Sequence, residues 1–208
     1  MSERDFYRDD AKHRVTAVIK EVEKLTSAEL LVSVRHQSAN LRQTDYLFGF
    51  AFSVVMLLLL LYLPLDFALW SFPIDVVLTF ALGTLACAQV GPLRRMLSSS
   101  RLRTDAVHDA ACAAFLRLGA SRTTRRTGVL VFVSTHDRLA EIVSDVGIDA
   151  AALGAPWQRA IESVRATAAR ADFDGFVAAL RALGPVLAET LPRREGDANE
   201  LPDDMDAA

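Results

Sequence analysis

Three acidic residues stand where a small sheet would bring carboxylates together. Glu29 opens the short apolar segment 29–35, and Asp145 and Asp149 follow the strand-like segment 139–144. Hard cations are bound by several carboxylate and carbonyl oxygens at once. We therefore interpret Glu29, Asp145 and Asp149 as candidate ligands for Ca²⁺ or Mg²⁺. The alternative is that these acids cap turns and helix starts by accepting backbone N–H bonds.

A second polar set, His36, His136 and Asp137, follows the ends of the apolar segments 29–35 and 128–134. Imidazole nitrogens and a carboxylate can bind a transition metal, but this spacing matches no recognised metal motif, and histidines in turns are often only solvated. Parallel strands bring their carboxyl ends to the same edge of a sheet. We therefore expect this set at the edge opposite Glu29 and Asp145.

Several functional classes are excluded by the sequence. The only lysines are Lys12, Lys20 and Lys24, so no phosphate-binding G-x-x-x-x-G-K-[ST] loop exists downstream of them. The chain contains no G-x-S-x-G, H-E-x-x-H or dinucleotide-binding motif. The formal net charge of −3 argues against a nucleic-acid partner, which needs a clustered basic surface. We expect no nucleotide or organic cofactor and no nucleic acid.

The elements that position these residues alternate between helices and short strands. Segments 29–35 (ELLVSVR) and 128–134 (GVLVFVS) are short, apolar and rich in Leu and Val, and 139–144 (LAEIVS) alternates between apolar and polar residues, as strands do. Apolar residues recur every three or four positions in 5–25 and 104–118, which predicts one-sided helices. The helix between the first two strands predicts that they are parallel, and the tight turn before 139–144 predicts an antiparallel hairpin.

Two long apolar stretches interrupt this pattern. Residues 47–65 carry no charge, and residues 72–90 carry only Asp75. At about 1.5 Å per residue, each helix would match the hydrocarbon core of a bilayer, which is roughly 30 Å thick. Pro64, Trp70 and Pro73 between them are typical of an interfacial turn. We interpret 45–92 as a transmembrane hairpin; the alternative is a buried helical hairpin in a soluble protein.

The flanking charges predict the orientation of this hairpin. Arginines stand on both outer flanks, whereas the connecting turn has neither Lys nor Arg. The flanking residues are Arg35, Arg42, Arg94, Arg95, Arg101 and Arg103. By the positive-inside rule, both termini and the soluble domain lie in the cytoplasm. Dense charges of both signs in 1–14 argue against a cleaved signal peptide, so we expect a bacterial cytoplasmic (inner) membrane protein.

Three parts of the chain follow from these assignments. Residues 1–44 and 93–192 form one discontinuous α/β domain, and 45–92 form the hairpin with spans at about 47–65 and 72–90. Residues 193–208 (RREGDANELPDDMDAA) are polar and mostly acidic. A segment so poor in apolar residues cannot offset its ordering entropy, so we expect a disordered acidic tail.

The order of motifs along the soluble sequence resembles the TPM domain. The motifs are T-S-A-E at 26–29, T-G-V-L-V-F-V-S at 127–134, Asp137-Arg138, D-V-G-I at 145–148, and Leu183-Gly184. The resemblance covers most of the soluble sequence. It implies a three-layer α/β/α fold with a small mixed sheet, here interrupted by the two-helix transmembrane hairpin.

The resemblance implies more than one function. TPM proteins include thylakoid-lumen proteins linked to photosystem repair, auxiliary proteins of an animal receptor and bacterial membrane-attached members, and some have been ascribed acid phosphatase activity and divalent-metal binding. Such domains commonly follow a signal peptide, whereas here a hairpin interrupts the domain. Our first hypothesis is a membrane-anchored interaction or regulatory module facing the cytoplasm, with the lipid bilayer and another membrane protein as partners. The alternative is a divalent-metal-dependent acid phosphatase acting on cytosolic phosphomonoesters.

Overall fold

A computed structural model of the chain divides it into two compact units. The first consists of residues 1–38 and 104–208, and the second of residues 39–103. The residues that the structure describes are 3–36, 42–62, 71–90, 100–194, 197, 199–202 and 204–207. Most of the predicted turn between the spans, Arg94 and Arg95 lie outside this set.

The first unit contains a four-stranded mixed sheet with strand order β3-β2-β1-β4. Its strands are β1 (Glu29–Arg35), β2 (Gly128–Ser134), β3 (Leu139–Ser144) and β4 (Asp206–Ala207). β1 and β2 are parallel and β3 is antiparallel to β2, which confirms both predicted pairings. Every residue of β2 is buried, because helices cover both faces of the sheet. This burial explains why β1 and β2 have continuous apolar sequences, whereas the half-buried outer strand β3 alternates.

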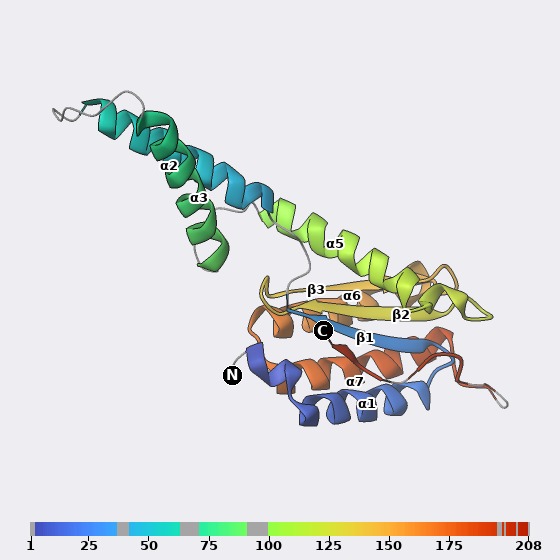
Figure 1. The fold of residues 1–208 in the computed structure, drawn as a ribbon. Helices are drawn as coiled ribbons and strands as arrows, with labels where there is room; N and C mark the ends of the chain where they lie inside the picture. The colour runs from blue at the N-terminus through green and yellow to red at the C-terminus, as the bar shows by residue number, and fades with distance from the viewer. Residues whose placement is uncertain are drawn as a thin grey trace. The chain divides into compact units, whose positions relative to one another are not determined.

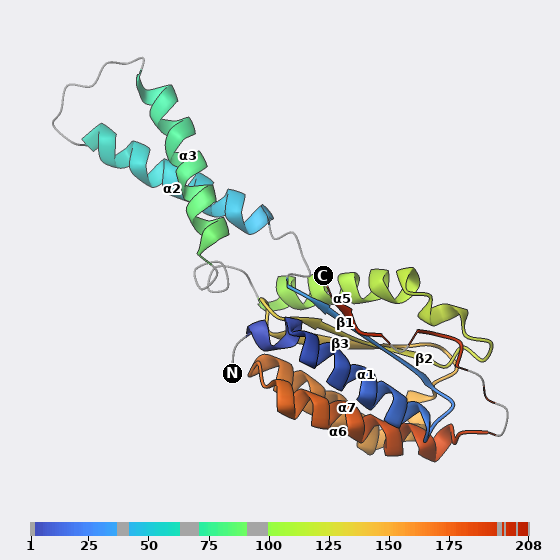
Figure 2. The same ribbon diagram turned by 60° about the horizontal axis from the view of Figure 1, so that its bottom comes forward.

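Helices lie on both faces of this sheet (Figures 1 and 2). One face carries α1 (Asp9–Glu23), α6 (Ala150–Ala169) and α7 (Phe173–Thr190), and the other carries α5 (Ser100–Arg117). The larger core, under the three helices, includes Val15, Val131, Trp157 and Leu180. The smaller core, under α5, includes Leu31, Phe115, Leu130 and Phe132. Short 3₁₀ turns occur at Glu3–Tyr7 and Ala120–Arg122.

The C-terminal segment differs from its prediction. Residues 193–208 were expected to be disordered, but Asp206 and Ala207 pair with Ser33 and Val34 as the parallel strand β4. Met205 is buried in the larger core. The expectation is therefore wrong for these residues. A prediction from composition does not count the backbone hydrogen bonds that a sheet edge offers. With those bonds, one buried methionine and the ion pairs of Asp206 are enough to order these residues.

The second unit contains two helices, α2 (Arg42–Tyr62) and α3 (Ser71–Gln89). Within them, Asp45–Tyr62 and Phe72–Gln89 are long and apolar enough to cross a membrane, with mean hydropathies of 2.0 and 1.5. The two helices pack closely at Gly49 and Gly83. A Cβ atom at Gly49 would collide with Thr84 Oγ1, and a Cβ at Gly83 would lie 3.1 Å from the Cα of Gly49. Small residues at such a contact are typical of helix packing in membranes.

Candidate functional site

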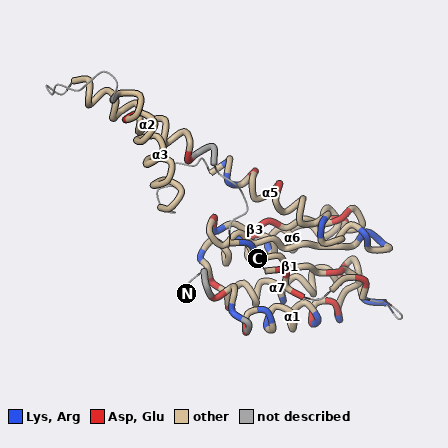
Figure 3. Tube along the Cα trace, viewed as in Figure 1, with Lys and Arg blue, Asp and Glu red and all other residues tan. Residues whose placement is uncertain are grey.

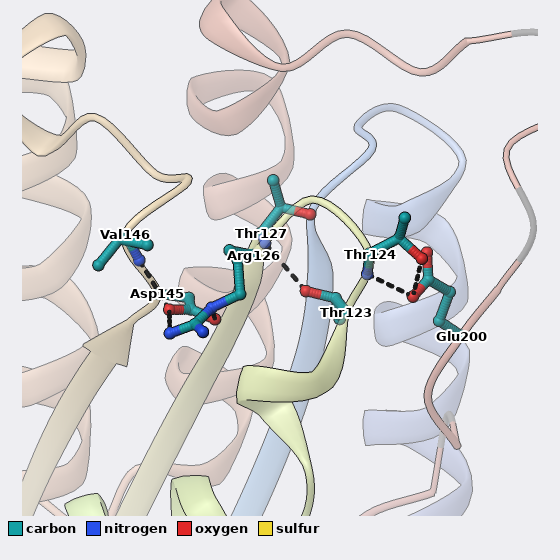
Figure 4. A network of polar contacts seen from close by, with 7 residues as sticks. All are labelled: Thr123, Thr124, Arg126, Thr127, Asp145, Val146 and Glu200. Carbon is teal, nitrogen blue, oxygen red and sulfur yellow. Dashed lines mark hydrogen bonds and ion pairs between the residues drawn. The ribbon is translucent and has the colours of Figure 1, made fainter.

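Glu29 and Asp145 lie at the same end of the sheet, as predicted. Glu29 donates its backbone N–H to Thr127 O at 3.2 Å, and Asp145 donates its N–H to Gly128 O at 2.9 Å. Glu29 is the register partner of Gly128, and Gly128 also bonds Asp145. The two acids therefore lie at the same end of the sheet, on either side of β2. Figure 4 shows the polar network around Asp145.

Asp145 forms a two-pronged ion pair with Arg126. Arg126 Nε and Nη2 donate to the two carboxylate oxygens of Asp145 at 2.7 and 2.9 Å, and Val146 N–H donates to it at 2.8 Å. The side chain of Asp145 is only 3% exposed. Burial acts to raise the pKa of Asp145, but the hydrogen bonds and charge of Arg126 and the Val146 N–H outweigh it and lower the pKa below its ordinary value.

The local backbone brings Arg126 to this position. Arg126 adopts a left-handed conformation with φ of 59°, and its carbonyl accepts the Gly147 N–H at 2.8 Å. A Cβ atom at position 147 would collide with the carbonyl oxygen of Arg125, so glycine is needed for this close approach. The Asp145–Gly147 turn and the residues before β2 are thus held against each other.

Asp149 has a different partner and a structural role. Its carboxylate accepts the N–H groups of Ala151 and Ala152, each at 3.0 Å, at the start of α6. These bonds satisfy donors that a helix start leaves without intrahelical partners. The capping alternative considered from the sequence is therefore confirmed for Asp149.

Glu29 lies in a less polar setting. One of its carboxylate oxygens, Oε2, is buried with no hydrogen-bond partner among the described residues. Burial raises the pKa of Glu29, although the backbone N–H groups of Glu200 and Leu201 act in the opposite direction. The C-terminal segment therefore lies beside Glu29.

The structure brings Glu29 and Asp145 to one edge but does not group the predicted metal ligands. Among the described residues, no cluster of three or more His, Cys, Asp or Glu side chains could hold a metal ion. Asp145 already bonds Arg126, and Asp149 already caps α6. A Ca²⁺ or Mg²⁺ site made by Glu29, Asp145 and Asp149 stays a prediction.

The histidine set gathers at the opposite end of the sheet, as predicted. The rings of His36 and His136 lie 5.6 Å apart between centroids, and the ring of Tyr7 lies 6.5 Å from that of His36. Ser134 Oγ donates to the Asp137 carboxylate at 2.6 Å. Asp137 is thus bonded to the strand end that precedes it.

Sequence reasoning missed a polar cluster beside the outer strand β3. His108 Nδ1 lies 3.3 Å from Glu141 Oε1, and Arg165 Nη2 donates to Glu141 Oε2 at 2.8 Å. Cys112 Sγ lies 3.6 Å from His108 Nε2, one helical turn along α5. His108, Glu141 and Arg165 line a cavity of about 630 Å³. The four-residue spacing of His108 and Cys112 was the available sequence signal, whereas nothing local pointed to Glu141.

A second missed cluster holds the C-terminal strand. Asp206 Oδ2 accepts from Arg35 at 2.6 Å, from Arg117 at 3.1 Å and from Ser33 Oγ at 3.2 Å. Further back, Glu200 Oε2 accepts from the Thr124 N–H at 2.7 Å and from its hydroxyl at 3.0 Å (Figure 4). In Figure 3 basic residues lie on α5 and on the turn that follows it. Arg117 belongs to α5, whereas Arg35 belongs to β1. These contacts join residues far apart in sequence, so no local pattern could indicate them.

Comparison with known proteins supports the fold alone. No family model matches the chain, and no curated protein sequence matches it. Among solved structures, the chain is similar to the NMR structure of BA42 protein from the psychrophilic bacteria Bizionia argentinensis sp. nov., with a TM-score of 0.59 and 18% identity. The similarity covers 97% of this chain and 94% of that one.

Proposed function

We propose that the chain is a membrane-anchored interaction module with a TPM-like, three-layer α/β/α domain. In this proposal α2 and α3 cross the bacterial cytoplasmic membrane as a hairpin, and the α/β unit lies in the cytoplasm with both termini. There it binds and regulates another membrane protein. The observation that carries the proposal is the exposed apolar surface of α2 and α3.

This surface is broad and apolar on both helices, which supports contact with lipid. Only 17% of the apolar window in α2 and 11% of that in α3 is buried within the structure. Large side chains point outward along both helices, including Leu47, Phe50, Leu58, Leu61, Val77 and Leu82. Helices that are apolar on all sides are either buried in a core or surrounded by lipid. Low burial distinguishes them from core helices, which supports the second setting.

Two hydroxyls of these helices bond the backbone of their own helix, as polar groups in hydrocarbon need to do. Ser53 Oγ donates to Phe50 O at 2.9 Å, and Thr79 Oγ1 donates to Asp75 O at 2.6 Å. Both hydroxyls therefore find partners on their own helix. In a bilayer no water is available, so internal pairing of this kind is required.

Membrane extraction tests the anchor. Full-length protein in isolated membranes should resist carbonate and be released by detergent. A Leu58→Arg, Val77→Arg double variant should shift to the soluble or aggregated fraction, because each arginine costs about 3 kcal/mol at the centre of a span. The matched control is Leu116→Arg, at an exposed apolar position of α5 in the α/β unit, and it should leave partitioning unchanged. Release of the wild-type protein by carbonate would contradict the anchor.

Thiol labelling tests the orientation. In a Cys87→Ser background, Cys112 should react with a membrane-impermeant maleimide only after the cells are lysed. A cysteine introduced at Ala68, between the two helices, should react in intact spheroplasts once the outer membrane is removed. The opposite labelling pattern would place the α/β unit outside the cytoplasm.

Photo-crosslinking in living cells tests the interaction. A photoreactive residue at exposed positions of the α/β unit should join the protein to one membrane protein. The crosslink should disappear in the Leu58→Arg, Val77→Arg variant, whose α/β unit is no longer held at the membrane. A crosslink unaffected by loss of the anchor would indicate a soluble partner instead.

A further inference from the structure

We propose that the outer edge of β1 is a docking site for an extended acidic segment of a partner protein, and that Glu200, Leu201 and residues 205–207 of the chain occupy this site when no partner is bound. The inference rests on the proposed interaction function and names its surface and the kind of partner. The occupant is inferred from the chain's own C-terminal segment, which shows what chemistry the site accepts.

The edge is only partly filled. β1 runs from Glu29 to Arg35, and among the described residues β4 pairs with it only through Ser33–Asp206 and Val34–Ala207, while the backbone of Glu200 and Leu201 lies beside the Glu29 side chain. A strand edge with so few backbone pairs is a template for another extended chain. Recognition by strand addition uses backbone hydrogen bonds for affinity and side-chain sites for specificity. The short pairing leaves room for a longer segment to replace it.

An acidic side chain is selected at the centre of the site. Two guanidinium groups, from Arg35 on β1 and Arg117 on α5, converge on one oxygen of Asp206, with Ser33 Oγ as a third donor. The side chain of Arg35 is 17% exposed, so it is partly shielded from water. Charge-assisted bonds of this kind are about twice as strong as neutral ones. A neutral or basic residue here would leave both arginines without this acceptor.

An apolar side chain is selected one residue earlier. Met205 is 6% exposed and belongs to the larger core. Beside it lies a cavity of about 410 Å³, lined also by Lys12, His13 and Thr16 of α1. A side chain larger than methionine could fill part of this space. The site therefore favours a partner with a bulky apolar residue directly before its acid.

A second acid is selected near the beginning of β2. Glu200 bonds the backbone and hydroxyl of Thr124, and Leu201 packs against the smaller core. Glu200, Met205 and Asp206 thus define a pattern of one acid followed five and six residues later by an apolar residue and a second acid. The rest of the C-terminal segment is also acidic, since residues 195–208 contain no Lys or Arg. Its six acids are Glu195, Asp197, Glu200, Asp203, Asp204 and Asp206.

The covalent link to the rest of the chain explains how a strand of only two residues stays bound at the edge of β1. Because the tail belongs to the same chain, its effective concentration at the edge is on the order of millimolar. A partner segment must therefore bind with more contacts, or be held at the membrane beside the module, to displace it. Membrane anchoring under the proposed function supplies the second condition.

Peptide binding to the full-length protein in detergent tests the inference. The probe is a fluorescent synthetic peptide of residues 199–208, and the readout is anisotropy. Wild-type protein should bind it weakly, because its own tail competes. Asp206→Ala protein should bind it about tenfold more tightly, since its own tail has lost the main ion pair. The matched control, Glu189→Ala, alters an exposed acid of α7 outside the segment and should behave like wild type.

Variants of the site and the peptide complete the test. Adding Arg35→Gln or Arg117→Gln to the Asp206→Ala protein should reduce peptide affinity at least tenfold, and a peptide carrying Asp206→Lys should not bind. Equal affinity of wild-type and Asp206→Ala proteins, or binding of the lysine peptide, would overturn the inference. A dimer formed by exchange of tails, without peptide, would overturn the choice of partner.

Hydrogen exchange gives a readout that does not depend on the peptide's label. The amides of β1 should exchange faster in the Asp206→Ala protein and regain protection when unlabelled peptide is added. Slow exchange that is unchanged by the substitution would count against the site. Protein that resists carbonate but binds no peptide would overturn the docking site alone, whereas protein that binds peptide but is released by carbonate would overturn the anchor alone.

Discussion

At the scale of single residues, three carboxylates at one end of the sheet show how neighbours decide what an acid does. Asp145 is buried but receives three hydrogen bonds, so its charged form is favoured. Glu29 is shielded without a full set of partners, so its charged form is disfavoured. Asp149 caps a helix. From the sequence, all three were candidates for one shared role as metal ligands, with capping of turns and helix starts as the alternative.

Replacing Asp145 by Asn should destabilise the α/β unit at neutral pH. The substitution removes a charged acceptor from Arg126 and Val146, and the exposed side of the pair limits the loss to about 1 kcal/mol. Because the pKa of Asp145 is lowered in the folded state, this stabilisation is present above the unfolded pKa of about 3.9 and is lost as pH falls through the lower folded value. Thermal unfolding at several pH values checks this, with Asp109→Asn on the exposed face of α5 as control. A difference from wild type that persists at the lowest pH would contradict it.

Replacing Glu29 by Gln should have the opposite sign. Because the pKa of Glu29 is raised, the folded state is penalised at pH values above it, and the penalty fades as pH falls toward the unfolded value of about 4.3. Glu29→Gln should therefore stabilise the unit by about 0.5 kcal/mol at pH 7 and by less near pH 4. Denaturant unfolding measures both, with the exposed Glu162→Gln as control. Destabilisation at pH 7 would point to an ionised role for Glu29, such as binding a cation.

Substitutions at Asp149 separate capping from metal binding. Asp149→Ala should cost about 1 kcal/mol of stability, whereas Asp149→Asn should be nearly neutral, because asparagine caps a helix as well as aspartate. Calorimetric titration with Ca²⁺ and Mg²⁺ tests the predicted site in the same variants. Saturable binding that is lost in Asp149→Asn, although stability is kept, would assign a ligand role to Asp149.

At the scale of elements, close contacts rather than helix propensity determine how α2 and α3 meet. Gly49 and Gly83 face each other, and Tyr46 stacks with Phe80 at a centroid distance of 6.4 Å. The four-strand sheet depends likewise on contacts between distant segments, since β4 is only two residues long. A strand as short as β4 forms because β1 offers it backbone partners.

Gly49→Val should disturb the helix pair. The added side chain would meet the carbonyl of Phe80 and Thr84, and such overpacking costs about 1–3 kcal/mol. Spin labels on α2 and α3 should report a longer or broader distance by electron resonance in detergent. Leu59→Val, at an exposed position of α2, is the control and should leave the distance unchanged. An unchanged distance in Gly49→Val would show that the contact does not set the packing.

At the scale of the whole molecule, the two units have separate packing. Both hydrophobic cores of the α/β unit are built only from residues of 1–38 and 104–208. The hairpin contributes no residue to either core among the described residues. The α/β unit therefore does not depend on the hairpin for its core.

An internal deletion tests this independence. Replacing residues 39–103 by a flexible Gly/Ser linker should give a soluble protein that unfolds in one cooperative transition. Circular dichroism and size-exclusion chromatography check the product, with full-length protein in detergent as reference. Aggregated or unfolded product would show that the hairpin is needed to form the α/β unit.

The sequence by itself determined the features that repeat locally. Apolar and alternating segments located the three main strands, periodic spacing located α1 and α5, and the length and composition of α2 and α3 singled them out as candidate spans. The tertiary structure alone decided the features that join distant segments: the Arg126–Asp145 pair, the His108–Glu141–Cys112 cluster and the docking of Asp206 between Arg35 and Arg117. Local patterns report the preference of a segment for a conformation or a solvent. Ion pairs between residues up to 171 positions apart depend on how the sheet is assembled, which no local pattern records.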